Sequence, residues 1–146
     1  MKNRKRGFSL VELLIVLAVI AALIATITPV ALNAIRKAKA TQVAQNLKTL
    51  ASAIENKAYV EGVEAIVGTG NAGSTFTSTA VSNLTTYVRD LNSSYTATYD
   101  YSAGTFTVTV SYTGKDVEFG TVEDILQGVT GSTGQDIDYI FSFNVY

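Results

Sequence analysis

A single acidic side chain, that of Glu12, lies at the start of a long apolar run, where it is the residue best placed to form a specific pair. Four basic residues stand before it within residues 1–6, and no charged residue occurs from residue 13 to residue 32. An ionised carboxylate is costly in hydrocarbon, so an acidic residue in such a run usually has a partner and a function. The pattern therefore predicts that Glu12 has both.

Outside this motif the composition offers little for catalysis. The 146 residues include no His and no Cys, which removes the commonest general base, the thiolate nucleophile, thiolate metal sites and disulfides. No glycine-rich phosphate loop follows an expected strand, and no nucleophile is matched with a base. We therefore predict a structural protein that is not an enzyme and has no bound cofactor.

Acidic residues in the C-terminal part are the one pattern that could bind a metal ion. They are Asp116, Glu118, Asp136 and Asp138. Carboxylate oxygens are ligands that Ca²⁺ prefers. However, Asp136 and Asp138 flank the apolar Ile137, and this alternation is also typical of carboxylates that face water. Both interpretations stay open, and solvated carboxylates are the simpler one.

Charge divides the chain into a basic and an acidic part. Residues 33–57 hold five basic residues against one acidic residue, whereas from residue 58 onward ten acidic residues face only two basic ones. Phosphate neutralisation needs clustered Lys and Arg. We therefore expect no direct binding of nucleic acid by the isolated subunit.

The apolar run is long enough to span a membrane. A bilayer-spanning helix needs about 20 apolar residues. The basic residues before the run should hold the N-terminus in the cytoplasm. The small residue at a natural cleavage point, Gly7, lies before the run, so a cut there would leave the membrane helix attached to the mature protein.

Pro29 lies near the end of the apolar run, between Thr28 and Val30. Proline lacks a backbone N–H and disfavours helical geometry in the residue before it. Two interpretations of Pro29 are open. It either makes a plain kink near a membrane edge, or it makes a helix break at which the segment can unwind or extend.

Residues 33–60 continue as an amphipathic helix. The apolar positions recur at spacings of three, four and five, and from Val43 onward they form a single stripe on the helix. They are Ile35, Ala38, Val43, Leu47, Leu50 and Ile54. The opposite side is polar, so the stripe is available to cover a sheet.

The remaining residues, 61–146, predict a head with a small antiparallel sheet. Residues 62–79 are expected to be mainly irregular, and residues 81–91 to form a short helix. Alternation predicts strands at residues 95–101, 105–113 and 136–146, with a tight hairpin at residues 102–104. Gly114 and Lys115 suggest a second hairpin into residues 117–119, and residues 121–124 suggest a helix start. The fold class is α+β, with a long N-terminal helix packed on the sheet.

The chain resembles bacterial type IV pilin precursors, which carry class III signal peptides, in residues 5–14 (KRGFSLVELL) and in the helix that follows. The resemblance implies that a prepilin peptidase cuts between Gly7 and Phe8 and N-methylates Phe8. It also implies that Glu12 acts in assembly and that the helix near Pro29 can lose its structure in a fibre. The implied parts are a leader at residues 1–7, a transmembrane and assembly half at 8–32, an amphipathic half at 33–60 and a head at 61–146.

Cleavage suggests what Glu12 meets, because it creates a positive α-amino group at Phe8 at the same depth. A pair between Glu12 of one subunit and the Phe8 amine of its neighbour would recover much of the cost of burying both charges. Such a pair would also fix the register along a fibre. Many members of the family close the C-terminal end with a cysteine pair, which this chain lacks, so the apolar last strand is expected to secure that end.

The resemblance implies a structural subunit of a type IV pilus that polymerises into a surface filament for adhesion, twitching motility or DNA uptake. The alternatives are a type II secretion pseudopilin and a single-pass membrane-anchored binding domain that does not polymerise. The expected partners are copies of the same chain, prepilin peptidase, the pilus assembly machinery and, before assembly, inner membrane lipid. The precursor should lie in the cytoplasmic membrane and the assembled filament outside the cell.

Overall fold

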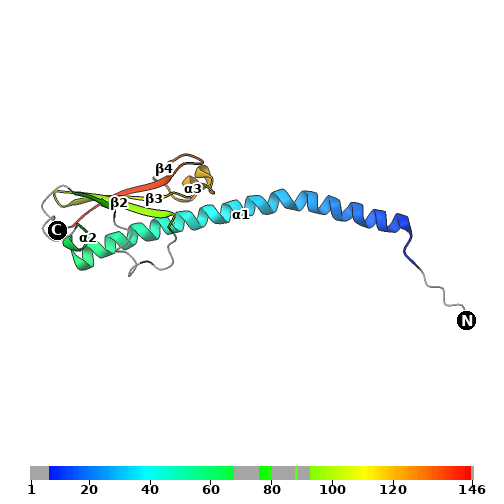
Figure 1. Cartoon of the computed structure of the whole chain (residues 1–146), viewed down its shortest axis with the longest axis horizontal. Coiled ribbons are helices and arrows are strands. Elements are labelled where there is room, and N and C mark those ends of the chain that lie inside the picture. The colour runs from blue at the N-terminus through cyan, green and yellow to red at the C-terminus, as the bar shows by residue number, and fades with distance from the viewer. Residues whose placement is uncertain (1–6, 68–75, 80–87, 89–92, 146) are drawn as a thin grey trace, which may run out of the picture. The chain divides into compact units, whose positions relative to one another are not determined.

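The computed structural model describes residues 7–67, 76–79, 88 and 93–145 of the chain. It comprises two compact units, residues 1–36 and residues 37–146, and one helix, α1 (Leu10–Glu61), runs through both (Figure 1). The predicted borders between leader, membrane half, amphipathic half and head stay predictions.

The first unit is a helix without a core. Every described residue of this unit, 7–36, is exposed. An 18-residue window of α1 near the N-terminus has a mean hydropathy of 2.9, and none of it is buried. By length and composition this helix can cross a membrane, and the lack of buried residues in this window distinguishes it from a helix in the core of a soluble protein.

α1 passes through Pro29 without interruption. Because proline has no N–H, the carbonyl of Ala25 lacks its usual donor four residues later. The neighbouring hydroxyls bind carbonyls one turn earlier, with Thr26 Oγ1 donating to Leu23 O at 2.9 Å and Thr28 Oγ1 donating to Ile24 O at 2.8 Å. The helix is thus not broken at Pro29 in this structure, and unwinding in a fibre stays a prediction.

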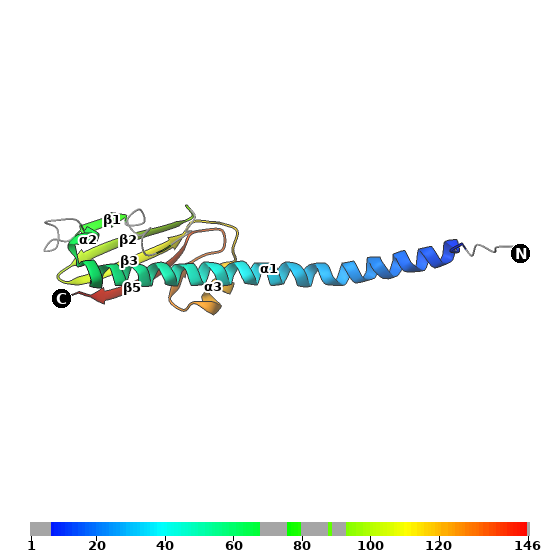
Figure 2. The same cartoon turned by 90° about the horizontal axis from the view of Figure 1, so that it is seen from below.

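The second unit is built on a five-stranded antiparallel sheet with the strand order β1-β2-β3-β5-β4. The strands are β1 (Phe76–Thr79), β2 (Tyr95–Ser102), β3 (Thr105–Tyr112), β4 (Val129–Gly131) and β5 (Ile137–Asn144). Two short helices, α2 (Glu64–Val67) and α3 (Phe119–Ile125), complete it. Figure 2 shows the second half of α1 lying along the face of the sheet. The α+β fold class predicted from the sequence is confirmed.

The core forms where the helix stripe meets the inward side chains of the strands. In α1 the predicted positions Val43, Leu47, Leu50 and Ile54 are at most 4 % exposed. The alternate residues of β2 and β3 are buried as predicted, namely Tyr95, Ala97, Tyr99, Tyr101, Phe106, Val108, Val110 and Tyr112. Period-two alternation in half-buried strands accounts for this agreement.

The apolar residues of α1 before Ala40 lie outside the buried stripe. Ile35 is 55 % exposed and Ala38 is also exposed, whereas Ala40 is fully buried. The stripe predicted from Val43 onward is confirmed. Its extent toward the N-terminus could not be read from the sequence, because helical periodicity does not show where along a helix the covering sheet begins.

The predicted hairpin between β2 and β3 is confirmed. Ser102 pairs with Thr105, so the turn contains only Ala103 and Gly104. Both have positive φ, 49° and 87°, which is the backbone of a type I′ turn. This turn fixes the register in which the aromatic residues of both strands face the helix.

The second predicted hairpin is wrong, because residues 117–119 form no strand. The edge of β3 that such a strand would need is already paired along its length with β5. Instead Val117 is buried and α3 begins at Phe119, two residues before the predicted helix start. Gly114 has a different role, since a Cβ there would clash with the hydroxyl oxygen of Tyr112.

Three short elements were not predicted. α2 and β1 lie within residues 62–79, which were expected to be mainly irregular, and β4 lies at residues 129–131, where no strand was predicted. The predicted helix at residues 81–91 lies outside the described residues except for Val88, which packs partly buried against the core. The last predicted strand is confirmed as β5, which pairs with both β3 and β4.

Candidate functional site

The predicted cleavage point lies in a non-helical segment. Residues 7–9 precede α1, which begins at Leu10, and the side chain of Phe8 is 86 % exposed. A Cβ added at Gly7 would meet nothing within 4 Å. The fold of the precursor therefore does not need glycine at this position, so any requirement for Gly7 must come from an enzyme that binds it. Cleavage between Gly7 and Phe8 and methylation of Phe8 stay predictions.

Ser9 and Glu12 form a reciprocal capping box at the start of α1. The backbone N–H of Ser9 donates to Glu12 Oε2 at 3.0 Å, and the backbone N–H of Glu12 donates to Ser9 Oγ at 3.2 Å. The N–H of Leu13 donates to the carbonyl of Ser9 at 3.2 Å and closes the first turn. This arrangement satisfies backbone donors that a helix N-terminus otherwise leaves without partners.

The capping box gives Glu12 a partner within its own chain. The sequence carried the signal, because a Ser followed three residues later by a Glu before an apolar run is typical of a capping box. The prediction for Glu12 rested on its charge alone and missed Ser9. The carboxylate thus lies at the very start of the helix, next to the residue that cleavage would make the new terminus.

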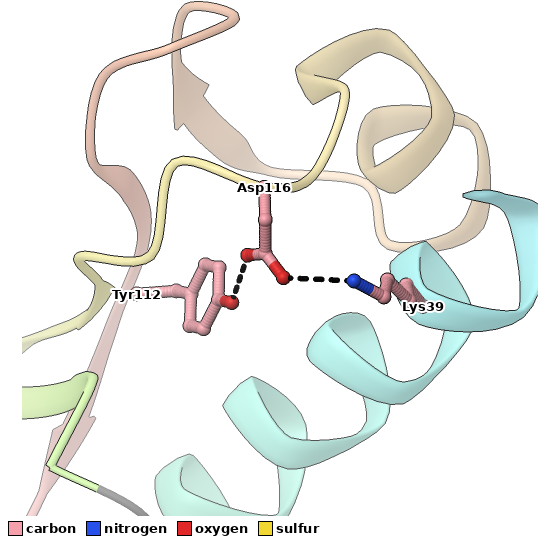
Figure 3. A network of polar contacts seen from close by, with 3 residues as sticks. All are labelled: Lys39, Tyr112 and Asp116. Carbon is pink, nitrogen blue, oxygen red and sulfur yellow. Dashed lines mark hydrogen bonds and ion pairs between the residues drawn. The ribbon is translucent and has the colours of Figure 1, made fainter.

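A second polar cluster lies in the second unit, where α1 meets the loop after β3. Asp116 accepts two bonds, from Tyr112 Oη at 2.5 Å and from Lys39 Nζ at 3.2 Å (Figure 3). Gly114 allows the ring of Tyr112 to reach this position. No pattern in the sequence indicates this cluster, because Lys39 and Asp116 are 77 residues apart.

The cluster borders a small polar cleft. A cleft of about 180 Å³ is lined by Lys39, Gln42, Val43, Asn46, Tyr95, Tyr112, Asp116 and Val117. In it, Asn46 Nδ2 donates to Tyr95 Oη at 3.0 Å, and the rings of Tyr95 and Tyr112 lie 5.0 Å apart. These contacts join the helix to the ends of β2 and β3.

Burial, hydrogen bonds and charge shift the pKa values of the side chains in this cluster. The hydroxyl of Tyr112, followed by the ammonium of Lys39, lowers the pKa of Asp116. Burial, followed by the hydrogen bond to Asp116, raises the pKa of Tyr112 well above its usual value. Burial also raises the pKa of Tyr95. The cluster therefore holds an ionised Asp116 between two donors, which suits it to fasten the loop after β3 to α1.

The remaining carboxylates of the calcium hypothesis are not gathered into one site. Glu118 lies exposed at the cap of α3, and Asp136 and Asp138 border a surface hollow together with Lys115 and Gln135. Within the described part of the chain, no three residues of the types His, Cys, Asp and Glu lie close enough to hold a metal ion. Calcium binding stays an untested prediction.

Comparisons with known proteins give one finding. Residues 2–28 match the family model described as a prokaryotic N-terminal methylation motif. The match includes Gly7, Phe8, Glu12 and the capping box, and it ends at Thr28. Neither characterised proteins nor solved structures give a match.

Proposed function

We propose that this chain, a type IV pilin-like precursor with a class III signal peptide, is the structural subunit of a type IV pilus. The observation that carries the proposal is the combination of a methylation motif with a fully exposed apolar helix and a separate compact unit. Such a helix needs a cover, which lipid supplies before assembly and other copies of the helix supply afterwards.

Before assembly the precursor is anchored in the cytoplasmic membrane. The motif and the apolar helix fit such an anchor. The basic residues within residues 1–6 keep the N-terminus on the cytoplasmic side. Prepilin peptidase then removes residues 1–7 and methylates Phe8, and the exposed, non-helical backbone around Gly7 supports its access.

In the filament the apolar halves of neighbouring helices pack together. The carboxylate of Glu12 pairs with the Phe8 amine of a neighbour, so that each subunit enters at a fixed register. An unpaired carboxylate would be costly in this apolar setting, and the pair recovers much of that cost. The pilus machinery assembles the chains, and the filament extends outside the cell. Adhesion, twitching motility and DNA uptake are functions that such a filament can serve.

Mass spectrometry of surface filaments tests this proposal. Filaments sheared from cells that produce the chain should contain it without residues 1–7 and with a methylated Phe8. Glu12→Ala should leave the processed subunit in the membrane and abolish filaments, because the charge pair is lost. Glu123→Ala, which removes an exposed carboxylate of α3, is the matched control and should assemble normally.

Other outcomes identify the alternatives. A mature protein that keeps residues 1–7 would indicate a single-pass anchored binding domain. A processed subunit that stays in the cell envelope without surface filaments would indicate a pseudopilin of type II secretion. Normal filaments from Glu12→Ala would show that the carboxylate has no role in assembly.

A further inference from the structure

The outer edge of β5 is open over part of its length. β3 pairs with all eight residues of β5, whereas β4 pairs only with the first three, which end at Tyr139. Beyond Tyr139 no strand of the described chain lies on that side, and Figure 2 shows this end of β5 at the margin of the sheet, away from β1. An open strand edge offers backbone N–H and C=O groups to another chain.

The pairing pattern identifies which backbone groups face this edge. The N–H of Val145 donates to the carbonyl of Gly104 at 3.0 Å, and these two residues continue the register of β5 with β3. In an antiparallel ladder such hydrogen-bonded pairs recur at every second residue. The odd-numbered residues of β5 therefore direct their N–H and C=O groups at β3, whereas those of Ile140 and Ser142 point outward from the sheet.

The open stretch is a gap that is closed at both ends. At one end β4 covers the edge as far as Tyr139. At the other end Tyr59 Oη, from α1, donates to the carbonyl of Asn144 at 3.0 Å. Between them, the N–H and C=O groups of Ile140 and Ser142 have no hydrogen-bond partner among the described residues. A strand rises about 3.3 Å per residue, so the gap has room for about three residues of extended chain.

The surroundings of the gap specify an extended segment with an apolar centre. No charged residue, glycine or proline occurs from residue 139 to residue 146, so the usual devices that protect a strand edge are absent. A residue that pairs opposite Phe141 would lie against its half-buried ring, and its neighbour would contact Ile140, which is 47 % exposed. An apolar side chain therefore fits at the centre.

The end of the gap next to β4 is acidic. Asp136 and Asp138 border a hollow there together with Lys115, and α3, which lies beside β4, exposes Glu123 and Asp124. The carboxylates outnumber the ammonium group. A segment that pairs antiparallel to β5 would end at this side, so a basic residue fits at its C-terminal end.

A second copy of β5 does not fit the gap, because a strand of eight residues would run into β4 and Tyr59. We propose that the edge at residues 140–142 is a docking site for a short extended segment of a partner protein, with an apolar central residue followed by a basic one. The segment adds to β5 as a strand. This proposal goes beyond the proposed function, because the site lies in the second unit and its test needs no filament.

Amide hydrogen exchange of the full-length chain in detergent, followed by nuclear magnetic resonance, tests the site. In the free chain the amides of Ile140 and Ser142 should exchange faster than those of Phe141 and Phe143, which are bonded to β3. The probe is a tetrapeptide with blocked ends and the sequence threonine, valine, threonine, lysine. For a Kd on the order of 1 mM, about 10 mM peptide should slow exchange at Ile140 and Ser142 about 10-fold.

Modified peptides test the two parts of the recognition. Methylation of both threonine amide nitrogens keeps the side chains but removes two donors, and it should weaken binding at least about 5-fold. Replacement of the lysine by glutamate should weaken binding about 2- to 10-fold. Equal binding of the methylated peptide would overturn the proposal, and equal binding of the glutamate peptide would overturn its basic residue.

Substitutions at Ser142 test the same edge from the side of the protein. Ser142→Pro removes the outward N–H without removing a bond to β3, so it should fold and lose peptide binding. Ser142→Ala keeps this N–H and is the matched control, which should bind as the unchanged chain does. If Ser142→Pro does not fold, the methylated peptide decides the question.

Other outcomes would also overturn the proposal. Slow exchange of Ile140 and Ser142 in the free chain would mean that the chain covers this edge itself. Exchange that slows as the protein concentration rises would assign the edge to a second copy. Exchange that the unmodified peptide leaves unchanged would show that the gap does not bind it. Each of these results is independent of whether the chain forms filaments.

Discussion

Asp116 illustrates how one carboxylate joins two elements. Tyr112 reaches it from the end of β3 and Lys39 reaches it from α1. The ion pair with Lys39 is about half exposed on both sides, so solvent screens it and its contribution alone is small. The hydrogen bond from the buried Tyr112 is better protected, and bonds to charged groups are stronger than neutral ones. The two bonds together hold the loop that leads into α3.

Replacement of this carboxylate should weaken the second unit mildly at neutral pH. In Asp116→Asn the charge is lost while the shape is kept, and we expect the free energy of unfolding to fall by about 1 kcal/mol. Urea unfolding of the full-length chain in detergent measures it. Asp124→Asn, at an exposed position of α3, is the matched control and should have no effect.

The same variant should reveal a pH dependence. The pKa of Asp116 in the folded chain is below its ordinary value of 3.8, so the unfolded chain binds a proton more readily near that pH. The stabilisation is therefore complete above about pH 5 and is lost as the pH falls below about 4. The difference between the unchanged chain and Asp116→Asn should narrow from pH 7 to pH 3. A difference that stays constant over this range would contradict the proposed role of the charge.

At the scale of elements, α1 is one helix with two kinds of surface. Among the described residues 7–39 none is buried, whereas Leu47, Leu50 and Ile54 are fully buried. Its sequence stays helical throughout, so the difference comes from what covers each half and not from the helix itself. Burial of apolar side chains against the sheet then supplies the stability of the second unit.

Identical substitutions in the two halves should therefore have different effects. Leu47→Ala removes a fully buried side chain and should lower the free energy of unfolding of the second unit by about 2–5 kcal/mol, because it leaves a cavity. Leu32→Ala acts on a side chain that is half exposed in the first unit and should change that stability by much less. Thermal unfolding followed by circular dichroism of the aromatic residues measures both. Equal losses of stability in Leu47→Ala and Leu32→Ala would contradict the division of α1 into a covered and an exposed half.

The elements predictable from the sequence were those with a long periodic signal. The alternation in β2, β3 and β5 and the spacing of the α1 stripe each extend over eight or more residues, and all were found. α2, β1 and β4 have only three or four residues, which are too few to show a period. The false hairpin at Gly114 arose because glycine also serves close packing, here against Tyr112.

The candidate sites also differ in how far the sequence could reveal them. The motif that contains Gly7, Phe8 and Glu12 could be recognised in the sequence because it is contiguous, and the capping box of Ser9 was visible in the same residues. The roles of Gly7, Phe8 and Glu12 in processing and assembly stay predictions. The cluster of Lys39, Tyr112 and Asp116 was not predictable, because only the packing of α1 on the sheet brings these side chains together. The C-terminal end, which has no disulfide, is held as expected by β5, where the ring of Phe143 stacks on Phe106 at 5.2 Å.

At the scale of the whole molecule, the two units differ in how far their apolar residues are buried. The buried apolar residues of the described chain begin at Ala40, so this core belongs entirely to the second unit. Exposed large apolar residues occur throughout the described first unit. In the described second unit they are few, namely Tyr59, Val60, Ile125 and Ile140. The exposed apolar side chains of the first unit therefore need a cover of lipid or protein.

A fragment that consists of residues 37–146 should accordingly fold alone and stay monomeric in water. It retains the core, the five strands and the Lys39–Asp116 pair, and it lacks the segment whose apolar side chains are all exposed. Gel filtration and circular dichroism should show a monomer that unfolds cooperatively, at a temperature within a few degrees of that of the full chain in detergent. The full chain without detergent should aggregate, since apolar surface of this extent is not stable in water. An unfolded fragment would mean that residues 1–36 contribute to the core, which would remove the physical basis for treating the apolar helix as a separate assembly device.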